Sequence, residues 1–370
     1  MAEWTKYKIS DIGTVVGGAT PSTKKSENYE NGDISWITPK DLSTFCGRYI
    51  KQGERNITET GYRSCSTQLL PRNSVLFSSR APIGYVAIAA KELCTNQGFK
   101  SVIPNENIDP LFLYYLLKYN KHNIESMGSG TTFKEVSANT MRNIIVFVPS
   151  DKRVQEKIAS ILGVLDDKIE ENERINNNLE QQAQAIYSRM FIEHRQESWS
   201  TGQLSDLISV KYGKDHKKLA DGNYPVYGSG GIIRYVEKPL HTGESVLIPR
   251  KGTLNNVIYV NEAFWSVDTM FYTEMLHPNI AKFVYHFVKS KDLASLNAGS
   301  AVPSMTTNIL NAMQLYIPDE KTLKKFENIV SPMYSAMQEN TKESKILANT
   351  RDTLLPKLMS GELDVSDIDL

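Results

Sequence analysis

A long internal repeat constrains the fold of this 370-residue chain more than any other feature of its sequence. The segment Ser129–Pro149 returns without a gap as Ala298–Pro318, and the strand-like segment Ser74–Gly84 returns as Ser245–Asn255. In both copies a mixed stretch of short apolar runs and glycine-rich turns precedes a long polar stretch. Because a duplicated sequence builds the same unit twice, we predict two similar globular domains, each followed by a long helix.

Each copy is predicted to form a mixed α/β fold. Amphipathic helices are expected over Pro110–Asn120 and Asn279–Lys289, each beginning near an Asp-Pro or His-Pro step. Apolar runs of strand length occur at corresponding places: Val75–Ser78, Tyr85–Ala89 and Ile144–Val148 in the first copy, and Val246–Pro249, Val257–Val260 and Met313–Ile317 in the second. We therefore divide the chain into a first globular domain over residues 1–150, a central helix over 151–198, a second globular domain over 199–318, and a C-terminal helix and tail over 319–370.

The two long polar segments carry the spacing of a coiled coil. Their seam positions follow one another at alternating steps of four and three, which is the pattern of a helix that packs along a partner helix. The seam includes Leu162, Leu165, Ile169 and Asn172 in the first helix, and Met333, Met337 and Asn340 in the second. Asn172 and Asn340 hold equivalent places, and a buried Asn fixes the register of a seam at a cost in stability. We expect the two helices to pair with each other; the alternative is that each packs only on its own domain.

Composition and cysteine use exclude several classes of protein. Lys and Arg number 42, and Asp and Glu also number 42, so the whole chain has no net charge that would point to a polyanion. The three cysteines form no Cys-x-x-Cys pair, and we expect neither a disulfide framework nor a zinc site. No apolar stretch approaches the ~20 residues that span a bilayer, and the polar N-terminus is unlike a signal peptide. We therefore expect a cytoplasmic protein that does not bind membranes.

A search for catalytic motifs finds one weak alternative. The sequence has no glycine-rich dinucleotide loop, no phosphate loop ending in Gly-Lys-Ser/Thr, and no Pro-Pro step of the kind that adenine methyltransferases use. Asp166, Asp167 and Lys168 follow an apolar run, as the metal ligands and lysine of a nuclease would. They also fall inside the coiled-coil segment, where we expect all three to face solvent. We therefore predict that this chain has no catalytic residue, no metal site and no cofactor of its own.

Polar and basic side chains gather in loops at matching places of the two copies. Arg80 follows a predicted strand, and the counterpart loop carries Arg250; an Arg can donate two parallel hydrogen bonds to guanine or to a phosphate. The loops provide these candidate DNA-binding residues: Lys24, Lys25, Ser78, Ser79, Arg80, Ser129, Thr131, Thr132, Lys134, Lys214, Lys217, Tyr227, Ser229, Arg250, Lys251 and Ser300. The alternative is that all of them belong to ordinary turns. Trp36 and Trp265 could stack on bases, but we expect both in the core.

Three stretches of the chain resemble a known family. The sequence WITPKDL (Trp36–Leu42) is typical of the first half of its members. The segment Gln155–Phe191 is similar to their central spacer helix, and Arg351–Leu363 is similar to their C-terminal helix and tail. On these residues the chain resembles the specificity subunits of type I restriction-modification systems over essentially its full length.

The resemblance implies that this chain reads DNA for catalytic partners. Each globular copy would be a target recognition domain for one half of a split site in double-stranded DNA, and the two helices would pair antiparallel as a ruler between the halves. Two adenine methyltransferase subunits would dock on the chain, restriction subunits with motor and nuclease activity could join, and S-adenosylmethionine, Mg²⁺ and ATP would belong to these partners. The second copy has YGSGGI (Tyr227–Ile232) in place of WITPKDL, so the two domains should read different half-sites. The competing function is a coiled-coil scaffold that reads no DNA.

Overall fold

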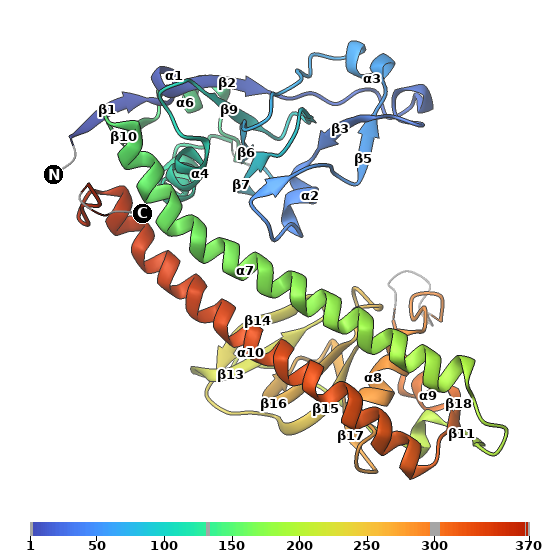
Figure 1. Ribbon diagram of the computed structural model, residues 1–370. Helices are drawn as coiled ribbons and strands as arrows, with labels where there is room; N and C mark the ends of the chain where they lie inside the picture. The colour runs from blue at the N-terminus through green and yellow to red at the C-terminus, as the bar shows by residue number, and fades with distance from the viewer. Residues whose placement is uncertain (1–2, 131–133, 297–303, 367, 369–370) are drawn as a thin grey trace. The chain divides into compact units, whose positions relative to one another are not determined.

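The chain divides into two compact units, each with a globular body and part of both long helices (Figure 1). The computed structural model describes residues 3–130, 134–296, 304–366 and 368. Unit 1 comprises Met1–Arg174 and Thr341–Leu370, and unit 2 comprises Ile175–Asn340. The long helices are α7 (Lys152–Tyr187) and α10 (Glu320–Met359). The boundary between the units therefore crosses each long helix.

The body of unit 1 contains β1 (Trp4–Lys8), α1 (Ile9–Ile12), β2 (Gly13–Gly17), β3 (Ile34–Ile37), α2 (Pro39–Ser43), β4 (Tyr49–Ile50), β5 (Arg55–Ile57), α3 (Glu59–Arg63), β6 (Val75–Ser79), β7 (Ile83–Ala89), β8 (Cys94–Thr95), β9 (Lys100–Pro104), α4 (Pro110–Tyr119), α5 (Lys121–Ser126), α6 (Ala138–Asn143) and β10 (Ile145–Pro149). A five-stranded sheet has the order β2-β9-β6-β7-β4, a three-stranded sheet has the order β5-β3-β8, and β1 pairs with β10. Phe112 and Leu116 of α4 are buried in one core cluster with Val75 and Phe77 of β6, which places the core between helix and sheet.

The body of unit 2 contains β11 (Ser200–Gln203), β12 (Ile208–Tyr212), β13 (Asp221–Gly228), β14 (Gly231–Val236), β15 (His241–Pro249), β16 (Ile258–Ser266), β17 (Met270–Met275), α8 (Ala281–Lys289), α9 (Thr307–Asn311) and β18 (Gln314–Ile317). One six-stranded sheet has the order β12-β17-β15-β16-β13-β14, and β11 pairs with β18. Phe283 and Val284 of α8 are buried with Val246 and Ile248 of β15. The core again lies between one helix and the sheet.

The expected mixed α/β architecture with two long helices is confirmed. All six predicted strands and both predicted short helices form, most of them with small shifts at their ends. The main difference is that β15 and β16 extend well beyond the predicted runs Val246–Pro249 and Val257–Val260 and pair antiparallel along their added length. The added residues of β15 are largely polar, and in β16 the exposed Asn261 and Glu262 separate the predicted run from a second buried stretch over Phe264–Ser266, so an apolar run marks only part of each strand.

A parallel strand pair shows that the two bodies share one frame. In unit 1, β3 pairs with β8 in parallel and places Ile37 beside Thr95. In unit 2, β13 pairs with β16 in parallel and places Tyr227 beside Ser266. The sequences around these pairs have little in common, so the repeated hydrogen-bond pattern identifies equivalent positions that the residues alone do not.

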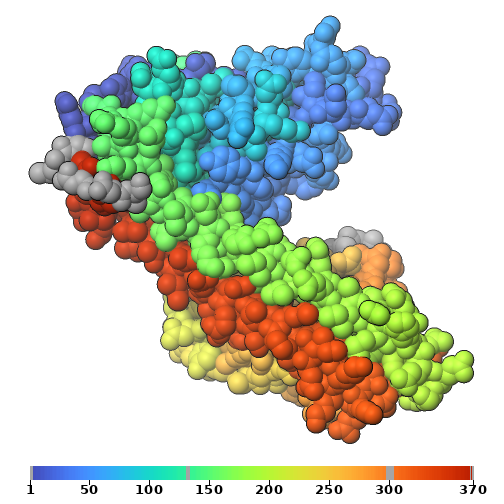
Figure 2. Space-filling view, viewed as in Figure 1, coloured from blue at the N-terminus to red at the C-terminus, as the bar shows by residue number. Residues whose placement is uncertain are grey.

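The long helices pack antiparallel within each unit, and Figure 2 shows their side chains in contact. In unit 1, the buried Asn172 donates from Nδ2 to Glu343 Oε2 (2.7 Å) and to Ser344 Oγ (3.2 Å). In unit 2, Asn340 Nδ2 donates to Asn176 Oδ1 (2.9 Å). Of the other predicted seam residues, one is buried (Leu162) and four are half-buried (Leu165, Ile169, Met333 and Met337). The helices therefore pair with each other and do not pack only on their own bodies.

The expectation that Asp166 faces solvent is wrong. Its side chain is buried and accepts hydrogen bonds from the Tyr115 hydroxyl (2.6 Å) and from the Arg351 guanidinium. Asp167 and Lys168 are exposed, as expected. A spacing of four and three describes the face that meets one partner helix, whereas α7 also packs against α4 of the body.

A buried cation joins each body to a long helix. In unit 1, Arg48 is 4% exposed and donates from Nε to Glu170 Oε1 of α7 (2.9 Å). In unit 2, Lys282 is 4% exposed and donates from Nζ to Glu327 Oε1 of α10 (2.6 Å) and to Glu244 Oε1 of β15 (2.8 Å). We call these two cations the clamps of units 1 and 2, because each fixes its body against a helix.

Candidate nucleic-acid interface

Backbone hydrogen bonds bring distant loops of unit 1 together. Ala19 N donates to Thr95 O (3.1 Å), Ser79 N donates to Gly98 O (2.7 Å), and Val136 N donates to Ser79 O (3.0 Å). The loops that these bonds join span 18–25, 79–82, 95–98 and 134–136, and we call them the loop cluster of unit 1. Most candidate DNA-binding residues of the first copy lie in or beside this cluster.

The loop cluster of unit 2 is joined by the same bonds. Lys214 N donates to Ser266 O (2.8 Å), Arg250 N donates to Thr269 O (2.8 Å), and Met305 N donates to Arg250 O (2.9 Å). These bonds join the loops over 213–218, 250–252, 266–269 and 304–305. The structure therefore assembles candidate residues from separate parts of the sequence into one cluster in each body.

The hydrogen bonds also set the residue register between the two clusters. The backbone N–H groups of Ser79 and Arg250 donate to Gly98 and Thr269, which lie just before strands β9 and β17. Their carbonyl groups accept from Val136 and Met305, which lie in the segments before β10 and β18, the last strands of the two bodies. Ser79 thus corresponds to Arg250, and Arg80 corresponds to Lys251. Arg80 and Arg250 lie in matching loops, but they are one residue apart in register.

Two glycines allow the first loop of each cluster to pass close to another backbone. A Cβ atom on Gly18 would lie 2.1 Å from Thr95 O, and a Cβ atom on Gly213 would lie 2.0 Å from Val267 O. No side chain fits at such distances. Glycine is therefore needed here for the close approach of two chain segments.

Two buried tryptophans brace the same loops. Trp36 Nε1 donates to Ala19 O (3.0 Å), and Trp265 Nε1 donates to Lys214 O (2.8 Å). Ala19 and Lys214 are equivalent, because each amide donates to the same position of the neighbouring strand. Both indoles are buried, which confirms that they belong to the core, although they come from strands β3 and β16 that are not equivalent.

The candidate residues of unit 1 differ in accessibility. Ser78 and Ser79 are fully buried, and the Ser78 hydroxyl donates to Pro82 O and accepts from Tyr85 N, both at 2.8 Å. The exposed candidates are Lys24, Lys25, Ser129 and Lys134. Thr131 and Thr132 lie outside the described residues. The two buried serines therefore shape the loop that carries Arg80.

An ionic triad that we did not identify from the sequence lies next to Arg80. Arg80 Nη1 is 3.5 Å from Glu135 Oε2, and Lys100 Nζ is 3.2 Å from Glu135 Oε1. Lys100 Nζ is also 3.4 Å from the Ser79 hydroxyl. In the sequence, the gapless repeat aligns Glu135 with Ser304, so the carboxylate is present in the first copy and not at the matching position of the second.

Arg250 has an aromatic partner in unit 2. Its guanidinium lies 5.4 Å from the ring centroid of Tyr212, which is a cation–π contact, and Nη1 donates to Asp268 O (3.3 Å). Tyr212 in turn packs edge-to-face on Phe271. Tyr212 is half exposed, and sequence reasoning did not single it out.

The other candidates of unit 2 divide in the same way. Tyr227 is buried and its hydroxyl donates to Glu262 Oε1 (2.6 Å); burial and this bond raise the pKa of Tyr227 well above its usual range. Ser229 is half-buried, and its carbonyl accepts from Asn256 Nδ2 (2.7 Å). The exposed candidates are Lys214, Lys217 and Lys251. Ser300 lies outside the described residues.

The two loop clusters present hydrogen-bond donors from Arg80, Arg250 and the exposed lysines. Among the residues that the structure describes, no three His, Cys, Asp or Glu side chains gather closely enough to hold a metal ion. Asp166 and Asp167 are engaged by Arg351 and Arg48, which argues against a nuclease site. Within the same described ranges, no helix has both the length and the apolar character needed to cross a bilayer.

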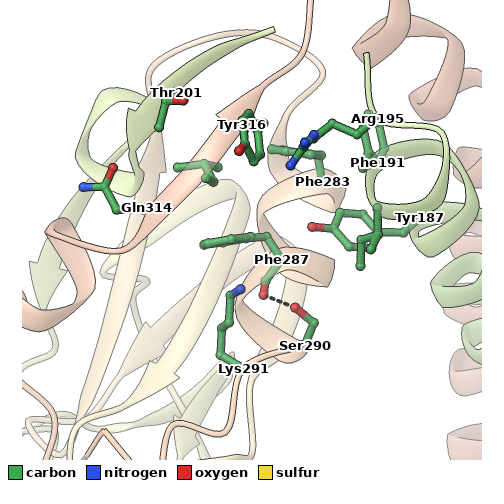
Figure 3. A pocket seen from close by; sticks show the side chains of 12 residues that line it. Tyr187, Phe191, Arg195, Thr201, Phe283, Phe287, Ser290, Lys291, Gln314 and Tyr316 are labelled. Carbon is green, nitrogen blue, oxygen red and sulfur yellow. Dashed lines mark hydrogen bonds between the residues drawn. The ribbon is translucent and has the colours of Figure 1, made fainter. Parts of the chain in front are cut away.

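A separate cavity of about 320 Å³ lies in unit 2 beside α8 and the β11–β18 pair (Figure 3). Its lining combines aromatic residues, among them Phe191, Phe283 and Tyr316, with polar ones, and the Arg195 guanidinium lies 4.1 Å from the Tyr316 ring centroid. None of the candidate DNA-binding residues lines it. The cavity is therefore distinct from the loop cluster.

Comparisons with known proteins agree on one family. The family model described as "Type I restriction modification DNA specificity domain" matches residues 1–181 and 196–348. The MjaIX specificity subunit of a type I restriction enzyme from Methanocaldococcus jannaschii is 30% identical over 99% of this chain and 95% of its own length. The EcoprrI specificity subunit from Escherichia coli is 23% identical over 85% of this chain and 83% of its own length.

A solved structure supports the fold. The crystal structure of a type I restriction-modification S subunit from M. genitalium superimposes with a TM-score of 0.60 and covers 99% of this chain and 97% of that one, at 20% sequence identity. The shared architecture extends over both copies of the repeat and both long helices.

Proposed function

The chain belongs to the family of type I restriction-modification DNA specificity subunits, and from this premise we propose that its two bodies each read one half of a split DNA target. Membership of the family gives the chain a role in DNA sequence specificity. The division into two half-sites is our interpretation of the repeat. The observation that carries it is the pair of loop clusters, which have the same hydrogen-bonded frame and different side chains.

The two clusters provide the means to read two different sequences. A shared frame would hold loops in the same orientation toward a DNA groove, while the side chains at equivalent positions offer different donors and acceptors. Lys251 stands where unit 1 has Arg80, and Arg250 stands where unit 1 has Ser79. The exposed lysines of the first loops are suited to phosphate contacts, which position a protein on DNA without reading sequence.

We assign catalysis to partner subunits. The proposed partners are two adenine methyltransferase subunits, with restriction subunits able to join, and S-adenosylmethionine, Mg²⁺ and ATP would bind to them. The proposal draws on the names of the relatives, which are parts of type I restriction enzymes, and on the absence of methyltransferase and ATPase motifs from the sequence. The work of such a complex on the chromosome would place it in the cytoplasm.

Mapping methylated adenines in cells that carry the chain with its methyltransferase partner tests this function. We expect one motif made of two short half-sites separated by a spacer of fixed length. In binding assays, the purified complex should prefer DNA that contains this motif, and its affinity should fall steeply with salt. A single uninterrupted motif would contradict the two-reader model, and equal affinity for all sequences would favour the scaffold alternative.

A further inference from the structure

The ionic triad of unit 1 lies in the middle of the proposed DNA-reading loops. We propose that Arg80 and Glu135 form one base-reading pair, in which Arg80 donates to a guanine and Glu135 accepts from the amino group of a cytosine. This inference rests on the proposed function and specifies what the first loop cluster recognises. Lys100 is assigned a positioning role behind the pair.

The geometry suits a pair of side chains that reach outward together. The side chains of Arg80 and Glu135 are 35% and 37% exposed, and their tips are 3.5 Å apart. That separation is close to the ~3.4 Å rise between neighbouring base pairs. A donor and an acceptor at this distance can therefore meet the edges of one base pair or of two adjacent ones.

The ammonium group of Lys100 explains how the negatively charged Glu135 can lie in a loop that is proposed to bind DNA. Its side chain is only 13% exposed, and Nζ lies near Glu135 Oε1, the Ser79 hydroxyl and Gln97 O. Held in this way, the ammonium group is poorly placed to reach a phosphate. Its charge instead offsets that of Glu135, which would otherwise be repelled by the DNA backbone.

Unit 2 shows that the frame does not require the triad. The strand pairing places Lys100 opposite Gly17 and places Phe271 opposite Tyr212, so Phe271 stands where unit 1 has Lys100. The gapless repeat places Ser304 where unit 1 has Glu135. The fold forms the same loop cluster without either charge, which argues that the triad serves recognition and not the frame.

The chemistry of base edges selects guanine and cytosine. Guanine presents two acceptors, N7 and O6, in the major groove, which suit the donors of Arg80. Cytosine presents the N4 amino donor, which suits the acceptor-only carboxylate of Glu135. Thymine O4 and guanine O6 would repel the carboxylate, and adenine places the acceptor N7 beside its amino group. A phosphate is excluded as a partner of Glu135 by like charge.

Methylated-adenine mapping of the complete complex tests the pair. Glu135→Gln should relax one cytosine position of a single half-site, because an amide can both donate and accept. Arg80→Ala should relax a guanine position in the same half-site, and Lys100→Met should relax the same cytosine as Glu135→Gln. We expect discrimination at these positions to fall ~5- to ~150-fold. The other half-site should keep all its bases in every variant.

Matched controls keep this inference separate from the proposed function. Glu59→Gln removes an exposed carboxylate of unit 1 that pairs with Arg63, and it should leave the motif unchanged. Glu135→Ser copies the residue of unit 2, and it should fold normally and relax the same cytosine. Unchanged motifs in all Arg80 and Glu135 variants would overturn the base-reading pair while leaving the split-site function intact. Evenly weakened binding by Arg80→Ala, with a salt slope reduced by about one unit, would also overturn it in favour of a phosphate contact.

Discussion

The loop cluster of unit 1 is ionic, whereas the loop cluster of unit 2 is built on aromatic rings. In the first, Glu135 lies between Arg80 and Lys100, and in the second, Tyr212 supports Arg250. The backbone bonds that join the loops are nevertheless the same in both. The comparison teaches that the repeat preserves the position of the loops and leaves the side chains on them free to differ.

The attachment of the bodies to the helices differs in a similar way. The clamp of unit 1 is an arginine that reaches α7, and the clamp of unit 2 is a lysine held between a strand and α10. Unit 2 also buries His286 between Gln184 Oε1 (2.7 Å) of α7 and the Tyr334 hydroxyl (2.9 Å) of α10. Each unit therefore uses its own polar contacts to hold a body on the helices, and variants can test the two sets separately.

Removing the clamps should have the largest effect. Lys282→Ala leaves Glu327, whose side chain is 14% exposed, without its cation, and we expect the free energy of unfolding to fall by ~3–5 kcal/mol. Arg48→Ala leaves Glu170, which is 32% exposed and can regain water, so we expect a smaller loss of ~1.5–3 kcal/mol. Denaturant unfolding of the full chain measures both. The exposed Arg63→Ala serves as a control and should cause no measurable change; equal losses in the two clamp variants would contradict the comparison.

The frame could be predicted from the sequence because it depends on patterns that repeat. The gapless match of Ser129–Pro149 and the four-three spacing of the helices led to the two bodies and to the pairing of the two helices, whereas the antiparallel direction was expected from the resemblance to specificity subunits. The clamps could not be predicted, because Arg48 and Lys282 meet residues far away in the sequence and no periodicity marks them. Asp166 was misplaced for the same reason, since its partners Tyr115 and Arg351 come from other elements.

The candidate site was predictable as a set of loops but not residue by residue. The repeat placed Arg80 and Arg250 in matching loops, and the strand hydrogen bonds agree with the alignment of Ser74–Gly84 with Ser245–Asn255 that Ser79 is the true counterpart of Arg250. The position of Ser78 beside Arg80 made it a candidate for DNA binding. Its hydroxyl, however, is hydrogen-bonded to the backbone of Pro82 and Tyr85 in the same turn. The sequence pattern therefore predicts which loops contain candidate DNA-binding residues, but only the structure shows which of their side chains are exposed enough to bind DNA.

Acid should lower the free energy of unfolding of unit 2 because of one residue, the buried His286. Burial lowers the pKa of His286 from 6.5 to about 4. Above pH 6.5 the ring is neutral in both the folded and the unfolded chain, so it adds no pH dependence. As the pH falls from 6.5 toward 4, the unfolded chain binds the proton first, and the free energy of unfolding decreases by up to ~3 kcal/mol. Denaturant unfolding at pH 7 and pH 4.5 should show this slope in the wild type and less of it in His286→Gln; identical slopes would show that the ring does not titrate as its burial implies.

Arg250→Ala sharpens the comparison between the two loop clusters. If Arg250 donates to a base edge, discrimination at one position of the half-site read by unit 2 should fall by ~1–3 kcal/mol. The half-site that responds to Arg80 variants should stay intact, because the two readers act separately. Methylated-adenine mapping measures the outcome, and Tyr212→Phe, which keeps the ring under the guanidinium, is the matched control. Relaxation of both half-sites by this single change would break the model of independent readers.

The seam asparagines should give the smallest effects, and effects of opposite sign in the two units. Asn172→Leu removes a buried amide whose acceptors, Glu343 and Ser344, lie where water can replace it, because the Glu343 side chain is 47% exposed. We expect a neutral or raised melting temperature, since an apolar seam residue packs without the cost of burying an amide. Asn340→Leu instead takes a partner from Asn176, which is half-buried and therefore less open to water than Glu343, so we expect a loss of ~1 kcal/mol. In the double variant both asparagine contacts across the seam are gone, although the Arg351–Asp166 pair still joins the two helices. Slipped or intermolecular pairing should appear as a raised solution mass by light scattering. An unchanged mass together with unchanged melting would show that the seam takes its register from the bodies on either side and not from its own asparagines.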